Sequence, residues 1–320
     1  MQISFDSLFG YFRVAFQSNS SLFSFRNTTK LSQKSKSNLP NLFFNHYLTT
    51  CKMKRIHIVP ILLTVIATTL LGCEEIASDD RYLSLLDESA GDDQVRKVLV
   101  EEYTGQFCVN CPTGHAVLDE IQSLYGEQIV VVGIHAGKLS WDDTANGGLK
   151  TPDGDVYADQ WHVQSYPSLI VSHQGTPLEN TALWQGAVQA QTGRQAVATI
   201  AVTAHADDGG TLTVRSGLCG NTAAKYQLWI TEDHIVAMQE TTDETLPGGY
   251  DLSYTHNHVY RASINGIGGE SVALTAGEKK ELMHTFALDS RWNRQNLHVV
   301  AFLYDNSGVL QVEETGVIDN

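Results

Sequence analysis

The order of apolar and polar residues divides the chain into two patterned regions. In the first, the apolar runs VRKVLVEEYTG (95–105) and QIVVVGIHAG (128–137) flank AVLDEIQSLYG, whose apolar residues recur at helical spacing up to Gly126. Continuous apolar runs are typical of strands covered on both faces, and the spacing of the middle segment is typical of an amphipathic helix. The pattern therefore predicts a β-α-β unit.

The second region consists of short, turn-bounded segments that often alternate apolar and polar residues. GTLTVRSGL, KYQLWITED, HIVAMQE and NLHVVAFLYD are examples, and all of them follow residue 196. Alternation with a period of two is typical of strands with one buried face, so this region predicts an antiparallel β-sandwich. Between the regions, a polar loop (136–155) is too long for a simple connection, and SYPSLIV predicts a strand opened by a proline.

A targeting segment precedes both regions. Residues 1–52 lack a sustained helical or alternating period, whereas Met53 opens MKRIHIVPILLTVIATTLLGCEE, with a short basic head and one apolar run. The run is too short and wrongly flanked for a permanent membrane helix, and it is typical of a secretory signal. We predict a signal peptide over residues 53–72 and a disordered, misassigned upstream extension over residues 1–52. A long targeting leader is the alternative.

The end of the signal, LLGC, resembles the lipobox of bacterial lipoproteins, although Leu71 is bulkier than is usual at its position. The resemblance implies cleavage after Gly72 and acylation of Cys73, with chains such as palmitate holding the protein on a membrane. Residues 73–94 are acidic and predict a solvated tether. The expected location is the outer membrane, with the protein facing the periplasm or the cell surface.

Charge and cysteine content narrow the class of protein further. The full chain carries a net charge of −15 and its leader is basic, so the rest of the chain is more acidic still. Such a body is repelled by phosphate, and we expect no nucleic-acid partner. Cys51 lies in the leader and Cys73 is taken by lipid, which leaves Cys108, Cys111 and Cys219 in an oxidising compartment. There a close pair predicts a disulfide or a disulfide-exchange site, and Cys219 predicts a small buried side chain.

The pair Cys-x-x-Cys stands at the predicted start of a helix, where Pro112 suits the first turn. Peptide dipoles at this end of a helix favour an anion and lower the pKa of the first cysteine most. We therefore assign Cys108 as an exposed nucleophile and Cys111 as the thiol that resolves a mixed disulfide. Two alternatives stay open: a purely structural disulfide, and a copper site with His115 and His135, because thiolates suit Cu(I).

The spacing from this pair to the YP of SYPSLIV resembles the thioredoxin fold. The resemblance implies that Pro167 is cis, packs against the disulfide and holds a substrate chain, with Tyr166 as a substrate contact. It also implies a buried acid near Glu101 or Glu102, although a solvated carboxylate at the strand end is the stronger expectation. Phe107 replaces the usual tryptophan, and Val-Asn replaces Gly-Pro between the cysteines, which leaves the redox direction open.

The segments EEYTGQFCVNCPTGH, IHAG, YPSLIV, THNHVYRA and LHVVAFLYD are similar to outer-membrane lipoproteins of Bacteroides-type bacteria, over roughly residues 95–318. Those proteins pair a thioredoxin-like domain with a C-terminal β domain. We therefore expect an α/β thioredoxin-like domain at residues 95–195, followed by an all-β immunoglobulin-like sandwich at residues 196–320.

The predicted function is thiol-disulfide exchange on protein or peptide thiols by an exported, lipid-anchored enzyme without organic cofactor or metal. The alternative is a non-enzymatic surface lipoprotein whose sandwich binds a partner and whose disulfide is structural. A structural zinc site is disfavoured because the sequence has no second Cys-x-x-Cys, and haem attachment would need histidine directly after the second cysteine. Two features are weaker. In THNH we expect His256 and His258 on the surface or in a loop. In the long loop, Trp141, Asp142 and Asp143 are expected either to form a rim over the sulfur atoms or to cap a short helix.

Overall fold

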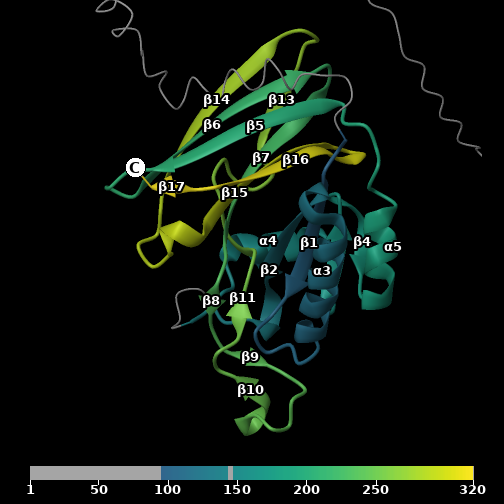
Figure 1. Cartoon of the computed structure of the whole chain (residues 1–320), viewed down its shortest axis with the longest axis vertical. Helices are drawn as coiled ribbons and strands as arrows, with labels where there is room; N and C mark the ends of the chain where they lie inside the picture. Colours follow the sequence, from purple (N-terminus) through teal and green to yellow (C-terminus); the bar gives the residue numbers. More distant parts are fainter. Residues whose placement is uncertain (1–94, 143–146, 320) are drawn as a thin grey trace, which may run out of the picture. The chain divides into compact units, whose positions relative to one another are not determined.

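The structure is a computed structural model that describes residues 95–142 and 147–319. The predicted extension, signal peptide and tether, with the lipidation site Cys73, lie outside the described residues, and so does Asp143. The described chain is rich in strands and has few helices (Figure 1). None of the helices within it is long and apolar enough to cross a membrane.

The first patterned region contains three helices packed beside strands. Strands β1 and β2 pair in parallel, whereas β3 pairs antiparallel with β1, and β4 pairs antiparallel with β3. The α3 residues Cys111, Gly114, Leu118 and Ile121 are buried, because their spacing of three and four residues places them on one face of the helix. The elements are β1 (Val98–Thr104), α3 (Cys111–Tyr125), β2 (Ile129–His135), α4 (Pro152–Gln160), β3 (Ser168–Val171), β4 (Gln174–Leu178) and α5 (Trp184–Gln189).

The second patterned region is built from strands, which confirms the prediction of a β-rich C-terminal part. Its longer strands alternate more covered and more exposed residues where only one face is covered; in β14 partly buried residues alternate with exposed ones. The elements are β5 (Ala198–Ala206), β6 (Thr211–Gly220), β7 (Ala223–Glu232), β12 (Val259–Ser263), β13 (Glu270–Ala273), β14 (Lys279–Ala287), β15 (Leu297–Asp305), β16 (Gly308–Gly316) and β17 (Ile318–Asp319).

Residues 235–256, between β7 and β12, leave the main sheets, and we call this segment the cap. HIVAMQE was predicted to form a sandwich strand, but the structure divides it between two short strands of the cap. The cap reaches the lower end of the molecule in Figure 1, beside β2 and α3. Its elements are β8 (Ile235–Val236), β9 (Gln239–Glu240), the 3-10 helix η4 (Pro247–Gly249), β10 (Tyr250–Asp251) and β11 (Thr255–His256).

One sheet runs through both patterned regions. Nine strands form it, in the order β16-β15-β7-β12-β2-β1-β3-β4, with β13 paired to β7. The junction is the parallel pairing of β12 with β2, through Val259 and Gly133. Strands β14, β6, β5 and β17 form a separate four-stranded sheet. The chain does change from helices to strands near residue 196, but because the large sheet crosses this point, the division into two domains stays a prediction.

Two apolar cores lie on opposite faces of the shared sheet. Leu228 and Ile230 of β7 pack with residues of β5 and β6 between the two sheets. Trp229 points to the other face, because side chains alternate along a strand, and it packs with Tyr103 of β1 and Tyr157 of α4. The C-terminal part is therefore β-rich, as the sequence predicted: two sheets pack on each other there, and the larger one continues into the β-α-β unit.

Candidate functional site

The predicted cysteine pair forms a disulfide at the start of α3. Cys108 lies in the turn after β1, and Cys111 is the first residue of α3. The Cα atoms are 5.3 Å apart, and the Cys111 amide donates a hydrogen bond to the Cys108 carbonyl at 3.1 Å. Cys108 is 3% exposed and Cys111 is fully buried. The expectation of an exposed Cys108 was therefore wrong, since tertiary contacts far along the chain cover it.

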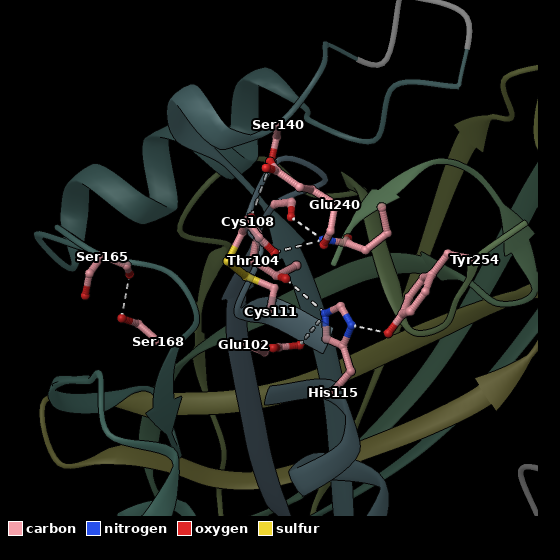
Figure 2. The surroundings of a disulfide bond; sticks show 12 residues. Glu102, Thr104, Cys108, Cys111, His115, Ser140, Ser165, Ser168, Glu240 and Tyr254 are labelled. Atoms are coloured by element: carbon pink, nitrogen blue, oxygen red, sulfur yellow. Dashed lines mark hydrogen bonds and ion pairs between the residues drawn. A yellow bond between two sulfur atoms is a disulfide. The ribbon is translucent and has the colours of Figure 1, made fainter. Parts of the chain in front are cut away.

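The cap is what covers Cys108. The side-chain amide of Gln239, which is fully buried, donates hydrogen bonds to the carbonyls of Gly105 at 3.2 Å and Cys108 at 3.0 Å. The Glu240 amide donates to the Gln106 carbonyl at 2.7 Å, which adds a backbone link beside the disulfide. Figure 2 shows Glu240 next to Cys108. The two residues of β9 thus donate hydrogen bonds to the carbonyls of Gly105, Gln106 and Cys108, in the turn that precedes α3.

Gln106 strengthens the same junction from the other side. Its side-chain amide donates to the Met238 carbonyl at 3.2 Å and to the Gly147 carbonyl at 2.9 Å, and its oxygen accepts from the Leu149 amide at 3.2 Å. Gln106 is itself fully buried. The turn before Cys108, the cap and the loop after β2 therefore form one hydrogen-bonded layer.

The two glutamates of β1 point to opposite faces of the sheet, and both are buried. Glu101 forms an ion pair with His173 at 3.1 Å, whereas Glu102 lies under α3. A Cβ atom on Gly114 would lie only 3.0 Å from Glu102 Oε1, so α3 packs directly on this carboxyl group. Burial, followed by the charge of Asp119, raises the pKa of Glu102 well above its usual range. A solvated carboxylate was the stronger expectation and was wrong, because α3 and β3 cover the end of β1.

Pro167 and Tyr166 precede β3. Their peptide bond is cis, as the resemblance implied. The same Cβ atom on Gly114 would also lie 3.0 Å from Pro167 Cβ, which places the proline against the first turn of α3. Tyr166 packs at the edge of the core that contains Tyr157, and burial raises its pKa to about 12. No ligand shows whether Tyr166 or Pro167 touches a substrate, so these roles stay predictions.

Three histidines lie together between α3, β2 and the cap. The His115 ring accepts or donates hydrogen bonds with Thr104 Oγ1 at 2.9 Å and Tyr254 Oη at 2.7 Å, as Figure 2 shows. The ring centroid of His256 is 6.4 Å from that of His115 and 5.2 Å from that of His135. These side chains and Glu102 line a cavity of about 70 Å³. We call His115, His135 and His256 the histidine cluster.

Burial lowers the pKa of all three imidazoles. The pKa of His115 falls to about 3 and that of His256 to about 4, and His135 falls well below its usual range. The neighbouring histidines add to the effect on His115 and His135, because a second positive charge nearby is unfavourable. The cluster is therefore neutral in the closed structure at neutral pH.

The described residues contain no group of three or more histidine, cysteine or acidic side chains arranged to hold a metal ion. The His115 ring is engaged by Thr104 and Tyr254, which gives no support to the copper alternative. His256, expected on the surface or in a loop, is 3% exposed, whereas His258 lies in a loop and pairs with Asp233 at 3.3 Å.

The long loop contributes a rim beside the disulfide rather than a helix cap. The Trp141 ring meets Phe107 edge-on, with centroids 4.7 Å apart, and Asp142 pairs with Lys150 at 3.0 Å. Helix α4 is capped instead by the Thr151 hydroxyl, which accepts from the Gly154 amide. Cys219 is free and partly exposed in β6. Reasoning from the sequence missed Gln239 and Tyr254, because no local motif signals contacts made more than 130 residues away.

The strand-rich fold and the buried disulfide define a β-rich protein with a closed cysteine pair. A family model described as outer membrane protein Omp28 matches residues 154–320, which is more than half of the chain. The chain belongs to the Omp28 family of outer membrane proteins. This membership confirms the predicted location at the outer membrane.

Two solved structures from Porphyromonas gingivalis are similar. One, HBP35, is 15% identical, covers 71% of this chain and 77% of its own, and superposes with a TM-score of 0.55, which shows a shared fold alone. The other is a domain of the outer membrane lipoprotein Omp28; it is 21% identical, covers 39% of this chain and 91% of its own, and has a TM-score of 0.28. No curated protein matches the chain.

Proposed function

We propose that this protein is a lipid-anchored surface protein of the outer membrane in which the Cys108–Cys111 disulfide is a structural cross-link. The observation that carries the proposal is the closure of the site: both cysteines are buried, and Gln239 binds the Cys108 carbonyl. Exchange requires an incoming thiolate to reach a sulfur atom, and a covered disulfide denies this access.

The proposed cross-link has a definite structural task. It ties the turn after β1 to the first residue of α3, and this turn offers the carbonyls that receive the cap. Because the disulfide restricts the turn, it keeps these acceptors in the positions that Gln239 and Glu240 require. We propose that the cysteine pair stabilises the seat of the cap, and that a partner protein binds elsewhere on the strand-rich part.

The anchor belongs to the same proposal. Acylated Cys73 and the acidic tether 73–94 would hold the folded part away from the membrane surface. We expect Cys73→Ser to release the protein from the membrane fraction, because without this cysteine the protein carries no acyl chain that could insert into the membrane. The measurement is detergent-phase partitioning with fatty-acid labelling, and Cys219→Ser is the matched control. A membrane-bound, unlabelled Cys73→Ser variant would contradict the anchor.

Removing the disulfide tests its structural role. We expect Cys108→Ser with Cys111→Ser to lower the free energy of unfolding by about 2 kcal/mol, from the entropy of closing a short loop. The melting temperature should fall by roughly 4–8 °C, and proteolysis should begin in the cap. Cys219→Ser, which leaves the pair intact, should melt like the wild type. A double variant with the melting temperature and protease sensitivity of the wild type would contradict the structural role.

A second function is favoured by one specific arrangement. The order β1-α3-β2 followed by β3-β4, with Pro167 on the first turn of α3 and buried Glu102 beneath it, supports a thioredoxin-like part and thiol-disulfide exchange with protein or peptide thiols. In this proposal Cys108 attacks, Cys111 resolves the mixed disulfide, and Glu102 accepts or returns the proton. The cap must first move away. Insulin reduction by wild type, absent in Cys108→Ser, would favour this function over the structural one.

A further inference from the structure

The cap is fastened to the rest of the molecule at two places. One is the junction of Gln239 and Glu240 with the turn that carries Cys108. The other is the contact of Tyr254 and His256 with the histidine cluster, where Tyr254 bonds to His115. Figure 2 shows Tyr254 reaching His115 from the cap, close to the disulfide. The first attachment contacts the turn of Cys108 directly, and the second holds the other arm of the same cap.

His256 connects the two attachments. It pairs with Ile235 across the short strands β11 and β8, directly before the residues that lead into Gln239. The Ala237 amide also donates to the Tyr254 carbonyl at 3.0 Å, which holds the two arms of the cap together. A displacement of His256 therefore displaces the backbone that presents Gln239 to Cys108.

The charged and titratable groups around His256 come from every neighbouring element. They are Glu102 of β1, His115 and Asp119 of α3, His135 of β2, Tyr254 and Asp251 of the cap, and Arg261 of β12. Arg261 acts on His135 and His256 in the same direction as burial and opposes a positive charge on either ring. Glu102 Oε2 lies 3.5 Å from His115 Nε2, and burial raises the pKa of Glu102, so its favoured neutral form does not balance a charge on that ring.

We propose that the cap is an acid-released cover: protonation of the histidine cluster expels Tyr254 and His256 from their seats and exposes the Cys108–Cys111 disulfide. Three cations cannot share this space, with ring centroids 5.2 and 6.4 Å apart beside Arg261. The proposal concerns access to the disulfide, so it holds for either function proposed above.

The direction of the pH effect on cap opening follows from proton linkage. In the closed protein the pKa of each imidazole is lowered, mainly by burial, whereas in an opened cap the rings regain water and their usual pKa near 6.5. The open form therefore binds more protons, and acidification below about pH 6.5 favours it. Glu102 has the opposite sign, because its raised pKa makes the closed form hold its proton more tightly, but it is one group against three imidazoles.

The test measures how fast a phosphine reduces the disulfide. The phosphine attacks one sulfur and breaks the S–S bond, and water then supplies the oxygen of the phosphine oxide and the protons of two thiols. The oxidised full chain is treated at about pH 7.5 and about pH 5, near the two ends of histidine titration. Samples are quenched with a maleimide, and the mass increase for two added groups is followed. Each rate is divided by that of oxidised glutathione under the same conditions.

Two histidine-to-asparagine variants make a matched pair. His256→Asn removes a titrating ring from the cluster, whereas His162→Asn removes an exposed histidine outside it. We expect the normalised rate of wild type and His162→Asn to rise at least about tenfold on acidification, which corresponds to about 1.4 kcal/mol. His256→Asn should change less than about threefold, because its cap has lost the ring that links both attachments.

A third variant keeps the proposal testable if His256→Asn fails to fold. Gln239→Ala removes the two bonds to Gly105 and Cys108, and we expect rapid reduction already at neutral pH with little further gain in acid. Hydrogen exchange should lose protection in residues 237–256 at acidic pH while β7 and β15 stay protected. A wild-type rate that does not depend on pH, or equal acceleration in His256→Asn, overturns the acid-released cap without affecting the tests of the proposed function.

Discussion

Replacing Trp229 with alanine should lower the free energy of unfolding by about 3–5 kcal/mol, as is usual for a large aromatic side chain removed from a core. Trp229 is fully buried in β7. Its ring meets those of Tyr157, Tyr260 and Phe302 at centroid distances of 5.1, 5.5 and 4.7 Å. Its indole nitrogen donates to the Tyr157 hydroxyl at 3.0 Å, and truncation also removes this hydrogen bond.

The position of Trp229 makes this variant informative about domains. The side chain belongs to the core shared by β1, β2 and α4 with β12, β15 and β16. If this core joins both patterned regions into one folding unit, Trp229→Ala should unfold in urea in a single transition with a lowered midpoint. The transition is followed by far-UV circular dichroism and by proteolysis on either side of residue 196, and both measurements should give the same midpoint.

Trp292→Ala is the matched control. Trp292 is only partly buried and stacks on Phe286 with ring planes 6° apart. We expect a loss of about 1 kcal/mol from this partly buried aromatic pair. Two separate transitions in Trp229→Ala, with only one of them shifted, would instead support the division at residues 195 and 196.

Glu101→Gln and Glu102→Gln should change stability in opposite directions although the two residues are adjacent. Glu101 is fully buried and its carboxylate contacts the partly buried ring of His173 at 3.1 Å, so the substitution removes the charge from this contact. We expect a loss of about 1–3 kcal/mol, because glutamine can still accept a hydrogen bond but carries no charge. The measurement is the urea midpoint at neutral pH.

At Glu102, in contrast to Glu101, the folded protein favours the neutral carboxyl group. Burial and the charge of Asp119 raise its pKa, so the folded protein favours the neutral carboxyl and gains stability as the pH falls toward its unfolded pKa. Glutamine is neutral at every pH. Glu102→Gln should therefore stabilise the protein at neutral pH by about 1 kcal/mol or more and flatten the pH dependence of unfolding. A destabilised Glu102→Gln, or a stabilised Glu101→Gln, would contradict this assignment of the two faces.

Much of the local structure followed from pattern. The predicted strands at 95–105 and 128–137 are β1 and β2, and the helix between them begins at Cys111 and ends at Tyr125. The proline-opened strand is β3, and the segment at 155–163 corresponds to α4. These elements were predictable because buried strands and amphipathic helices carry their own periodicity. The segment NTALWQGAVQAQTGRQ (180–195) is helix-like along its length, yet α5 spans only Trp184–Gln189.

The cap is the region whose structure the local pattern did not predict. HIVAMQE has the apolar content of a sandwich strand, and nothing local distinguishes it from one. Its residues instead pair within the cap and reach Gln106 and Cys108. The exposure of Cys108 and the surroundings of His256 were predicted wrongly for the same reason, since both depend on where this segment lies in space.

By itself, the sequence determined the neighbouring cysteines at a helix start and the alternation that makes the C-terminal part β-rich, and it predicts an export signal. Each of these features is encoded within about 20 consecutive residues, where spacing and residue type act directly on the backbone. Only the tertiary structure decided that β12 joins β2, that Glu101 and Glu102 both lie under cover, and that Gln239 closes the disulfide. Such contacts link residues far apart in the chain, and their free energy exists only when the whole sheet has formed.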